Sequence, residues 1–412
     1  AGEFAGMKIA EARPQIIEKL RAKGLVVKEE PYVHNIATAE RTGGIIEPQI
    51  KLQWFVDVDR PFAMVHSEIP GIESGSTPTL KGLMRAAVES GAVAMPQEGF
   101  RKAYFHLIDN LHDWCISRQI WFGHRIPVWS RGEEIAVGEA PHGEGWEQDP
   151  DVLDTWFSSA LWTFSTLGWP EQTKDLEVFH PTAFMSPGYE ILNLWVSRMI
   201  LMSGFHLGQV PFKTVLIHGL VRDKQGRKFS KSLNNGIDPL DMIDKYGADA
   251  LRMGLLVGSS IGNDISFDES KVKGYKHFAN KLWNIARFVL DNTKDADLNA
   301  LLVAGDAELL TTFETLTAEV TRDMDEYRMY LAAEKIYHYA WHELADKILE
   351  ESKPILAGVD AAARAARALL LITLLDRTLR LLHPFMPFVT EEIYQSMPTK
   401  DAKFLMVARW PS

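Results

Sequence analysis

The spacing of hydrophobic and polar residues divides the chain into stretches of different character. Up to about residue 95, a charged helical stretch at residues 9–23 precedes short β-like runs such as residues 53–58, and this mixture predicts a small α+β segment. Between about 96 and 270, apolar runs alternate with glycine-bearing loops and short helices, which is typical of α/β structure. A buried strand is expected at residues 214–217, directly before a His-Gly pair.

From about residue 271 onward, hydrophobic residues recur every three or four positions, which is the period of one face of an α-helix. Two such stripes are formed by Phe278, Leu282, Ile285, Phe288 and Val289, and by Leu371, Leu375, Leu379 and Leu382. An alanine- and arginine-rich stretch at residues 361–370 leads into the second stripe, which favours a packed helix over a low-complexity segment. We therefore predict an antiparallel helix bundle after the α/β part.

Composition narrows the class of protein without identifying its partner. With 46% hydrophobic and 24% charged residues over 412 positions, the chain has globular composition and enough length for two or three cores. No run approaches the roughly 20 apolar residues that span a bilayer, and the first residues lack the pattern of a signal peptide, so we expect a cytoplasmic protein without a membrane partner. The formal charge of −11 excludes a uniformly basic surface, but nucleic-acid binding needs only a local positive stripe.

The cysteine content argues against a structural metal site. Cys115 is the only cysteine, so the sequence contains no Cys-x-x-Cys pair and no partner for an intrachain disulfide. We therefore expect no structural zinc and no metal held by the protein's own side chains.

The clearest chemical signal is a basic loop that follows the predicted strand. Lys228 and Lys231 place two ammonium groups three positions apart, with small hydroxyl residues between and after them. Such a set can gather around a triphosphate and neutralise the charge that develops when pyrophosphate leaves. A Lys-x-x-Lys pair alone is more often a solvated loop. Here, however, the pair stands between a strand that ends in His-Gly and a polar and helical stretch at residues 234–252.

In this context, residues 216–232 resemble the Lys-Met-Ser-Lys-Ser region of class I aminoacyl-tRNA synthetases, with Phe229 in the methionine position. The resemblance covers essentially the whole chain and implies an α/β plus all-α fold: the second half of a Rossmann-like nucleotide fold with a stem-contact region, then a helical anticodon-binding domain. The implied divisions are 1–95 for the exit of the editing insertion and a connective α+β segment, 96–219 for the half Rossmann-like domain, 220–270 for the lysine loop and stem-contact region, and 271–412 for the helical domain.

Several segments resemble the valine branch of this family in particular. These are residues 123–127, 151–162 and 165–170, whereas residues 113–119 are shared with the isoleucine and leucine relatives. An isoleucine-specific relative is the nearest alternative, and a non-catalytic tRNA-binding module derived from a synthetase is an alternative of a different class. Retention of both lysines argues against the second alternative, because a pure binding module does not need that pair.

The resemblance implies that the strand end and the basic loop bind ATP. It assigns catalysis to Lys228 and Lys231, which would act on the pyrophosphate while Mg²⁺ bound with ATP bridges phosphate oxygens. The implied ATP-binding residues are His218, Gly219, Lys228, Phe229, Ser230, Lys231 and Ser232.

The same resemblance implies an apolar pocket for the valine side chain and a loop that contacts the aminoacyl adenylate. The implied residues are Phe122, Trp156, Gly188 and Glu190. A rigid aromatic wall excludes larger side chains but gains little from smaller ones. Phe122 stands where the family usually has tryptophan, and Glu190 where it usually has aspartate. On composition alone, both aromatic residues would be assigned to the core.

The helical region carries further aromatic and basic candidates. Four aromatic residues have the size and spacing of core anchors, namely Trp283, Trp341, Phe385 and Phe388. RNA contact is expected from exposed basic residues, by phosphate pairing and base stacking. The candidates are Lys271, Lys273, Lys276 and Arg287, although for each one taken singly a solvated side chain is the simpler interpretation.

Three features of the family are missing from the sequence. The His-Ile-Gly-His-like motif is absent, and residues 206–209 resemble it only superficially, because they precede the last strand of the fold. Most of the editing insertion and the C-terminal coiled coil of valine enzymes are also absent, so we expect no editing. We expect a C-terminal fragment or subunit that binds valine, ATP and tRNA(Val) and needs a separate N-terminal half. Alone, it should aggregate or hold a tight partner through exposed strand edge and apolar surface.

Overall fold

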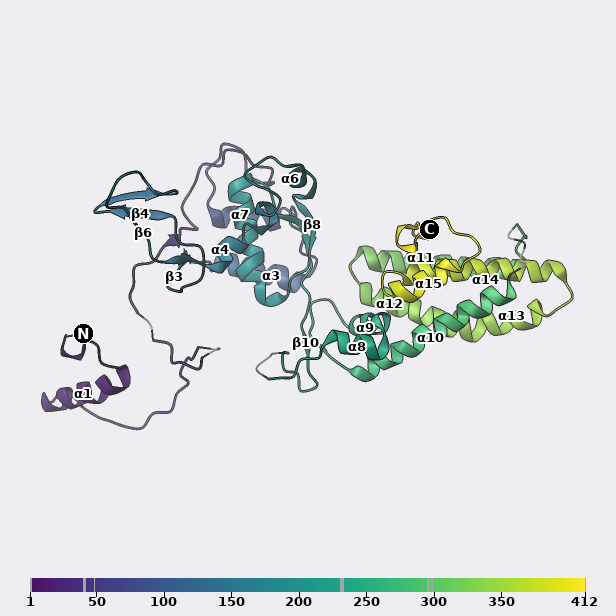
Figure 1. Cartoon of the computed structure of the whole chain (residues 1–412), viewed down its shortest axis with the longest axis horizontal. Helices are drawn as coiled ribbons and strands as arrows, with labels where there is room; N and C mark the ends of the chain where they lie inside the picture. The colour runs from purple at the N-terminus through teal and green to yellow at the C-terminus, as the bar shows by residue number, and fades with distance from the viewer. Residues whose placement is uncertain are drawn as a thin grey trace. The chain divides into compact units, whose positions relative to one another are not determined.

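The chain forms two compact units, Ala1–Gln53 and Trp54–Ser412 (Figure 1). The computed structural model describes residues 2–39, 42–47, 49–229, 233–294, 297 and 299–411. The smaller unit contains helix α1 (Ile9–Ala22) after a 3-10 turn at Gly2–Phe4, and most of its described residues are exposed. The predicted charged helix at the start of the chain is confirmed.

The larger unit begins with short strands and helices in the predicted α/β stretch. Its helical elements are α2 (Leu80–Glu89), α3 (Glu98–Asp109), α4 (Thr155–Ser159), α5 (Trp162–Ser165), α6 (Lys174–Phe179), a 3-10 turn at Tyr189–Ile191, a π-helical segment at Leu192–Val196, and α7 (Ser197–Leu207). Its strands are β1 (Phe55–Val56), β2 (Trp114–Cys115), β3 (Ser117–Arg118), β4 (Val128–Arg131), β5 (Glu134–Val137), β6 (Glu147–Gln148), β7 (Val152–Leu153), β8 (Thr182–Met185) and β9 (Phe212–Val215).

The parallel strands β8 and β9, connected by α7, form the centre of this part. Met185 pairs with Val215, and Ala94 forms a parallel bridge with Thr214. The bond from Ala94 N to Lys213 O and the bond from Leu216 N to Met185 O leave opposite edges of β9. Strand β9 therefore lies between the Ala94 segment and β8. The predicted strand before the His-Gly pair is confirmed, although it begins two residues earlier than expected.

The remaining strands form small sheets around this centre. Strand β1 pairs with β2, β3 pairs with β7, and β4 lies between β5 and β6, all antiparallel. The core consists of apolar side chains from α2, α3, α7 and β9, among them Leu83, Tyr104, Met199 and Phe212, each fully buried. Burying one such side chain contributes about 1.5–3 kcal/mol, so this part has a substantial core of its own.

A compact group of elements connects the α/β part to the helical region. It contains β10 (Val221–Arg222), α8 (Pro239–Tyr246), α9 (Ala248–Leu256) and β11 (Ile265–Ser266), and β10 pairs with β11 in parallel. Helix α8 begins where the Asp238 side chain accepts a hydrogen bond from Leu240 N and Pro239 fills the first turn.

The helical region consists of long helices, as the stripes of hydrophobic residues predict (Figure 1). These are α10 (Glu269–Asn292), α11 (Ala304–Asp325), α12 (Met329–His338), a π-helical segment at Tyr339–Ile348, α13 (Leu349–Leu356), α14 (Ala361–Leu382) and α15 (Pro387–Gln395), with a 3-10 turn at Leu405–Val407. Asp268 and Asp360 cap α10 and α14 by accepting hydrogen bonds from the first backbone N–H groups. The α/β part followed by a helical part confirms the predicted fold class.

The aromatic residues of the bundle only partly follow the prediction. Phe385 is 4% exposed and Trp341 packs partly buried against the core. The assignment of Trp283 and Phe388 to the core was wrong, because they are 45% and 65% exposed. Leu282 already occupies the core-facing position beside Trp283, so the indole lies on the neighbouring face of α10.

Helix α9 is fixed to the bundle by two charged side chains. The Asp249 carboxylate accepts hydrogen bonds from Phe388 N and Val389 N, at 3.2 and 2.7 Å, and so caps the start of α15. Arg252 donates to the carbonyl oxygens of Phe385 and Pro384. The stretch at residues 384–389 therefore has a structural role, because it connects α9 to the helix bundle.

A buried ion pair gives a test of the bundle's stability. Arg367 of α14 pairs with Asp306 of α11 at 2.7 Å, with side chains 10% and 1% exposed, and it also donates to Ser352 Oγ of α13. Asp306→Ala would leave a guanidinium charge unpaired in the core and should lower the free energy of unfolding by about 3–5 kcal/mol. Urea unfolding followed by far-UV circular dichroism measures this loss.

The matched control removes both charges. Asp306→Leu combined with Arg367→Met should recover most of the lost stability, because no charge then remains buried without a partner. Equal losses in the single and the double variant would contradict the electrostatic explanation.

Candidate functional site

Strands β8 and β9 end side by side, and this brings two predicted site segments together. Beyond the strands, Gly188 and His218 form a parallel bridge, and His218 N donates to Pro187 O at 3.0 Å. Glu190 and Gly219 follow directly on their respective segments. The carboxyl ends of parallel strands are where α/β folds bind ligands, so the predicted location is physically reasonable.

Gly219 is required by a close approach of two backbones. A Cβ atom built at this position would lie 1.8 Å from the carbonyl oxygen of Asn263, which no side chain can tolerate. Leu220 N donates to Asp264 Oδ1 at 2.8 Å, and Ile265 N donates to Leu220 O at 2.9 Å. The chain that leaves β9 is thus held against the segment that enters β11.

After β10 the chain turns back on itself, and we call residues 221–228 the lysine hairpin. Arg222 and Lys228 form an antiparallel bridge, and Gly226 N donates to Asp223 O at 2.9 Å across the turn. Gly226 has φ 77°, a conformation that favours glycine.

The Asp223 carboxylate accepts hydrogen bonds from Asn235 Nδ2, Arg227 N, Arg227 Nε and Gln225 N. Donation by Asn235 is the largest cause that lowers the pKa of Asp223 to about 2.

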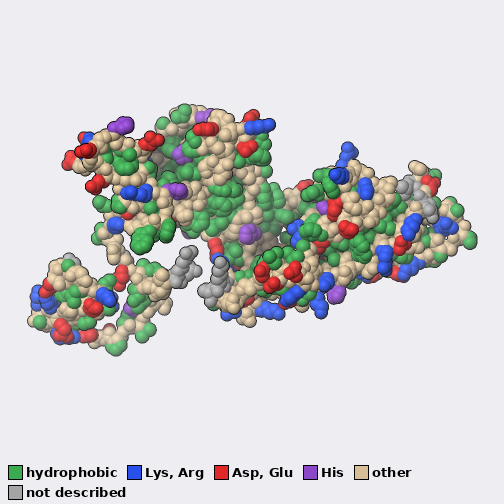
Figure 2. Space-filling model, in the orientation of Figure 1, with side chains coloured by type: hydrophobic (Ala, Val, Ile, Leu, Met, Phe, Trp, Pro, Cys, Tyr) green, Lys and Arg blue, Asp and Glu red, His purple; other side chains and the backbone are tan. Residues whose placement is uncertain are grey.

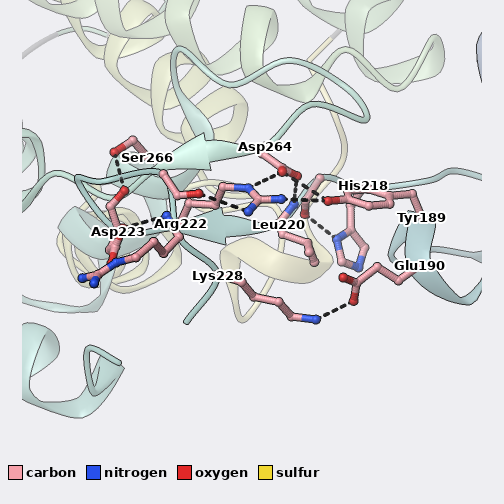
Figure 3. Close-up of polar contacts among 12 residues, drawn as sticks. Tyr189, Glu190, His218, Leu220, Arg222, Asp223, Lys228, Asp264 and Ser266 are labelled. Carbon is pink, nitrogen blue, oxygen red and sulfur yellow. Dashed lines mark hydrogen bonds and ion pairs between the residues drawn. The ribbon is translucent and has the colours of Figure 1, made fainter. Parts of the chain in front are cut away.

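Glu190 and Lys228, both predicted site residues, form an ion pair at this edge (Figure 3). Glu190 Oε2 lies 2.5 Å from Lys228 Nζ, and the two side chains are 47% and 54% exposed. Because an exposed ion pair contributes little to stability, about 0–1 kcal/mol, its cation can exchange one anionic partner for another at small cost. A polyphosphate is the kind of anion that could compete for it.

A second set of polar contacts lies beside this pair and was not predicted. Arg222 forms an ion pair with Asp264, and its Nη2 donates to the Tyr189 hydroxyl at 3.1 Å. The same hydroxyl lies 3.2 Å from Asp264 Oδ2 as a donor. Figure 3 shows Arg222 of the lysine hairpin reaching toward Asp264 and toward Tyr189, which precedes Glu190. Asp264 was not singled out from the sequence, because its contacts are with residues that are distant along the chain.

The rest of the predicted ATP site is only partly described. Ser230, Lys231 and Ser232 lie outside the described residues. Phe229 is partly buried and packs against a small core that includes Met242, so it anchors the chain just after the hairpin.

The two aromatic residues predicted for the amino-acid pocket have different surroundings. Phe122 is 85% exposed in the loop between β3 and β4, whereas Trp156 in α4 packs partly buried against the core. Within the described part of the chain, no ring contact joins them. Asp154, also unpredicted, is 5% exposed, caps α4 through Trp156 N, and accepts from Trp114 Nε1 at 3.1 Å. An aspartate directly before a helix is a recognisable cap signal, so this residue could have been found.

The four basic candidates for RNA contact fall into two groups. Lys271 donates to Val257 O, and burial lowers the pKa of its ammonium group, while Lys276 donates to Lys245 O at 2.8 Å. Lys273, Lys276 and Arg287 are exposed, whereas Lys271 is partly buried. Figure 2 shows Lys and Arg side chains along the edge that contains α8 and α10.

The segment that superficially resembles a nucleotide-binding motif has structural contacts. Residues 206–209 lie at the end of α7, where Gln209 Nε2 donates to Glu68 Oε1 at 2.8 Å and Glu68 N donates to Gly208 O at 2.8 Å. Among the described residues, no group of three or more His, Cys, Asp or Glu side chains is placed to hold a metal ion. In the same residues, no helix is long and apolar enough to cross a membrane.

Comparisons with known proteins agree with this arrangement. A family model described as "tRNA synthetases class I (I, L, M and V)" matches residues 7–144 and 137–268, and one described as "Anticodon-binding domain of tRNA ligase" matches residues 306–412. "Valine--tRNA ligase" of Clostridium acetobutylicum is 43% identical over 100% of this chain and 46% of its own length. "Valine--tRNA ligase" of Bacillus cereus is 44% identical with the same coverage. The chain thus spans about half the length of these relatives.

Solved structures show the same fold at low sequence identity. Mycobacterium tuberculosis methionyl-tRNA synthetase in complex with methionyl-adenylate has a TM-score of 0.67 and 20% identity, covering 88% of this chain and 66% of that one. A ternary complex of Agrobacterium radiobacter K84 LeuRS, tRNA and LeuAMS has a TM-score of 0.57 and 20% identity, covering 77% and 46%. Because the class I model matches well over half of the sequence, the chain belongs to the class I tRNA synthetases of the I, L, M and V group.

Proposed function

We propose that this chain is the C-terminal part of a valine-tRNA ligase, which activates valine with ATP and transfers the valyl group to tRNA(Val). The observation that carries this proposal is the identity of 43–44% with enzymes of that name over the whole chain. The alternatives are an isoleucine-specific relative and a non-catalytic tRNA-binding module derived from a synthetase. A cytoplasmic location belongs to the same proposal.

The proposed chemistry needs no covalent intermediate on the protein. The valine carboxylate attacks the α-phosphate of ATP and displaces pyrophosphate, and a terminal ribose hydroxyl of the tRNA then attacks the activated carbonyl and displaces AMP. Protein groups contribute by positioning reactants and by stabilising charge that develops in the transition state. Mg²⁺ would enter with ATP and neutralise phosphate oxygens.

Lys228 has the surroundings that this role requires. Its ammonium group is half-exposed at the strand-end edge and paired with Glu190 at 2.5 Å, while its backbone is fixed by the bridge to Arg222. The side chain can therefore turn from Glu190 to the departing pyrophosphate without rearrangement of the hairpin. Lys231, whose surroundings are not described, is proposed as the second lysine acting on the pyrophosphate.

The proposed partners are the tRNA and a separate N-terminal half. For the tRNA, the exposed Lys273 and Arg287 are better candidates than Lys271 and Lys276, whose ammonium groups donate to backbone carbonyls. For the N-terminal half, the relatives contain about as much further sequence as this chain covers. Exposed aromatic side chains on the α/β part, such as Trp121 at 96%, provide apolar surface for such a contact.

Exchange of pyrophosphate into ATP tests the proposed function. We expect valine-dependent exchange when this chain is mixed with the N-terminal half of a valine-tRNA ligase, and none with either part alone, because the nucleotide site is shared between them. Isoleucine is the matched control substrate and should give much less exchange. Isoleucine-dependent exchange would favour the isoleucine alternative, and retained tRNA binding without any exchange would favour the non-catalytic module.

Substitution of the lysines tests their catalytic assignment. Lys228→Ala and Lys231→Ala should each lower the rate of exchange about 10²–10³-fold, the usual effect of removing one group that stabilises transition-state charge. The affinity for tRNA(Val), measured by filter binding, should change less than about 2-fold. Lys224→Ala, in the turn of the same hairpin, is the matched control and should leave exchange unchanged. Equal losses in exchange and in tRNA binding would contradict the assignment.

A further inference from the structure

One carboxylate contacts both of the chain segments that carry Glu190 and Lys228. Asp264 precedes β11, and its side chain is 25% exposed. Its Oδ1 accepts from Leu220 N at 2.8 Å, and its Oδ2 accepts from the guanidinium of Arg222 and from the Tyr189 hydroxyl. Figure 3 shows these contacts converging on Asp264. We call Asp264, Arg222 and Tyr189 the Asp264 clamp.

Each group held by Asp264 is directly connected to a proposed substrate contact. Tyr189 immediately precedes Glu190, and Arg222 lies opposite Lys228 in the antiparallel bridge. Arg222 Nη1 also donates to Gly226 O at 3.1 Å, so the guanidinium braces the turn of the lysine hairpin. The clamp therefore connects the segment that carries Glu190 to the segment that carries Lys228.

The polar groups of the clamp form hydrogen bonds with one another, so they differ from the groups that would contact the substrates. Arg222 donates to the Tyr189 hydroxyl, and that hydroxyl donates to Asp264, so the three side chains form a closed set. Hydrogen bonding from Leu220 N and from Arg222 holds the pKa of Asp264 below its usual value. A carboxylate that is ionised and already engaged by three donors is suited to hold other groups in place.

The backbone in this region does not depend on the Asp264 side chain. Ile265 N donates to Leu220 O at 2.9 Å and Phe267 N donates to Arg222 O at 2.8 Å, so β10 and β11 stay paired through their main chains. Loss of the carboxylate should therefore release Tyr189 and Arg222 while the strands remain in place.

We propose that Asp264 is a positioning residue that fixes Lys228 relative to Glu190 and so sets the geometry in which the ammonium group meets the pyrophosphate. This inference rests on the proposed function and deepens it by naming a residue that acts through Lys228. Asp264→Asn is the sharpest variant. The amide oxygen can still accept from Leu220 N, but the charge that holds the Arg222 guanidinium is lost.

The first test uses this chain mixed with the N-terminal half of a valine-tRNA ligase and measures cleavage, so it does not depend on activity. Tryptic cleavage after Lys224, Arg227 or Lys228, followed by mass spectrometry, reports how often the hairpin opens. In Asp264→Asn the cleavage rate should rise about 5-fold or more, because the guanidinium that braces the hairpin is released. Asp244→Asn, an exposed substitution on α8, is the control and should leave the cleavage rate unchanged. The melting temperature of both variants should equal that of the unsubstituted protein. An unchanged cleavage rate in Asp264→Asn would overturn the proposal.

The second test measures coupling to Lys228 in the reconstituted enzyme. Asp264→Asn should lower the maximal rate of valine-dependent exchange about 10-fold and leave the KM for valine unchanged. In a Lys228→Ala background the same substitution should cost less than about 2-fold, because the residue through which it acts is gone. A full 10-fold loss in that background would overturn the proposal. If the unsubstituted enzyme shows no exchange, the proposed function fails, while the cleavage experiment still decides whether Asp264 holds the hairpin.

Discussion

The parallel alignment of β8 and β9 is the constraint on which the site depends. Because the two strands end at the same edge, residues that are distant in sequence become neighbours, as the bridge between Gly188 and His218 shows. The absence of a side chain at Gly219 then lets the departing chain pass against Asn263, which places the start of β11 beside the same edge. Everything that follows, including the hairpin and its lysine, takes its position from this junction of two strand ends and one close backbone contact.

Charges at this edge are organised by depth. Asp223, in the turn of the hairpin, and Asp264, before β11, are each engaged by several donors, so their charge is used within the structure. Glu190 and Lys228 are half-exposed and form an ion pair. The hydrogen-bonded carboxylates make the frame of the site rigid. In the exposed ion pair, Lys228 can exchange the Glu190 carboxylate for a ligand of higher negative charge. This division suits a site that must hold its frame and still release one cation to a polyphosphate.

Sequence patterns predicted the elements better than the contacts between them. The helical stripes and the strand before His218 follow from periodicity, and the pattern around Lys228 placed a candidate site at the strand end where Glu190 also lies. Periodicity could not tell that Trp283 lies beside the core-facing stripe, because a single period describes a face without giving its width. Asp264 could not be found either. Its importance comes from tertiary contacts with Tyr189, Leu220 and Arg222, which the periodicity of the sequence does not indicate.

The two parts of the larger unit differ in how far they expose large aromatic side chains. Asp249 of α9 caps α15, and Arg367 pairs with Asp306 within the bundle. The aromatic residues Trp283 and Phe388 of the bundle are 45% and 65% exposed. The α/β part instead exposes Trp121 and Phe122, at 96% and 85%, in the loop between β3 and β4. Large aromatic side chains rarely remain so exposed unless they meet a ligand or another protein surface. This difference agrees with the proposed function. The bundle folds around its own core, and the exposed aromatic side chains of the α/β part are the surface that, under this proposal, contacts the remaining length of the enzyme.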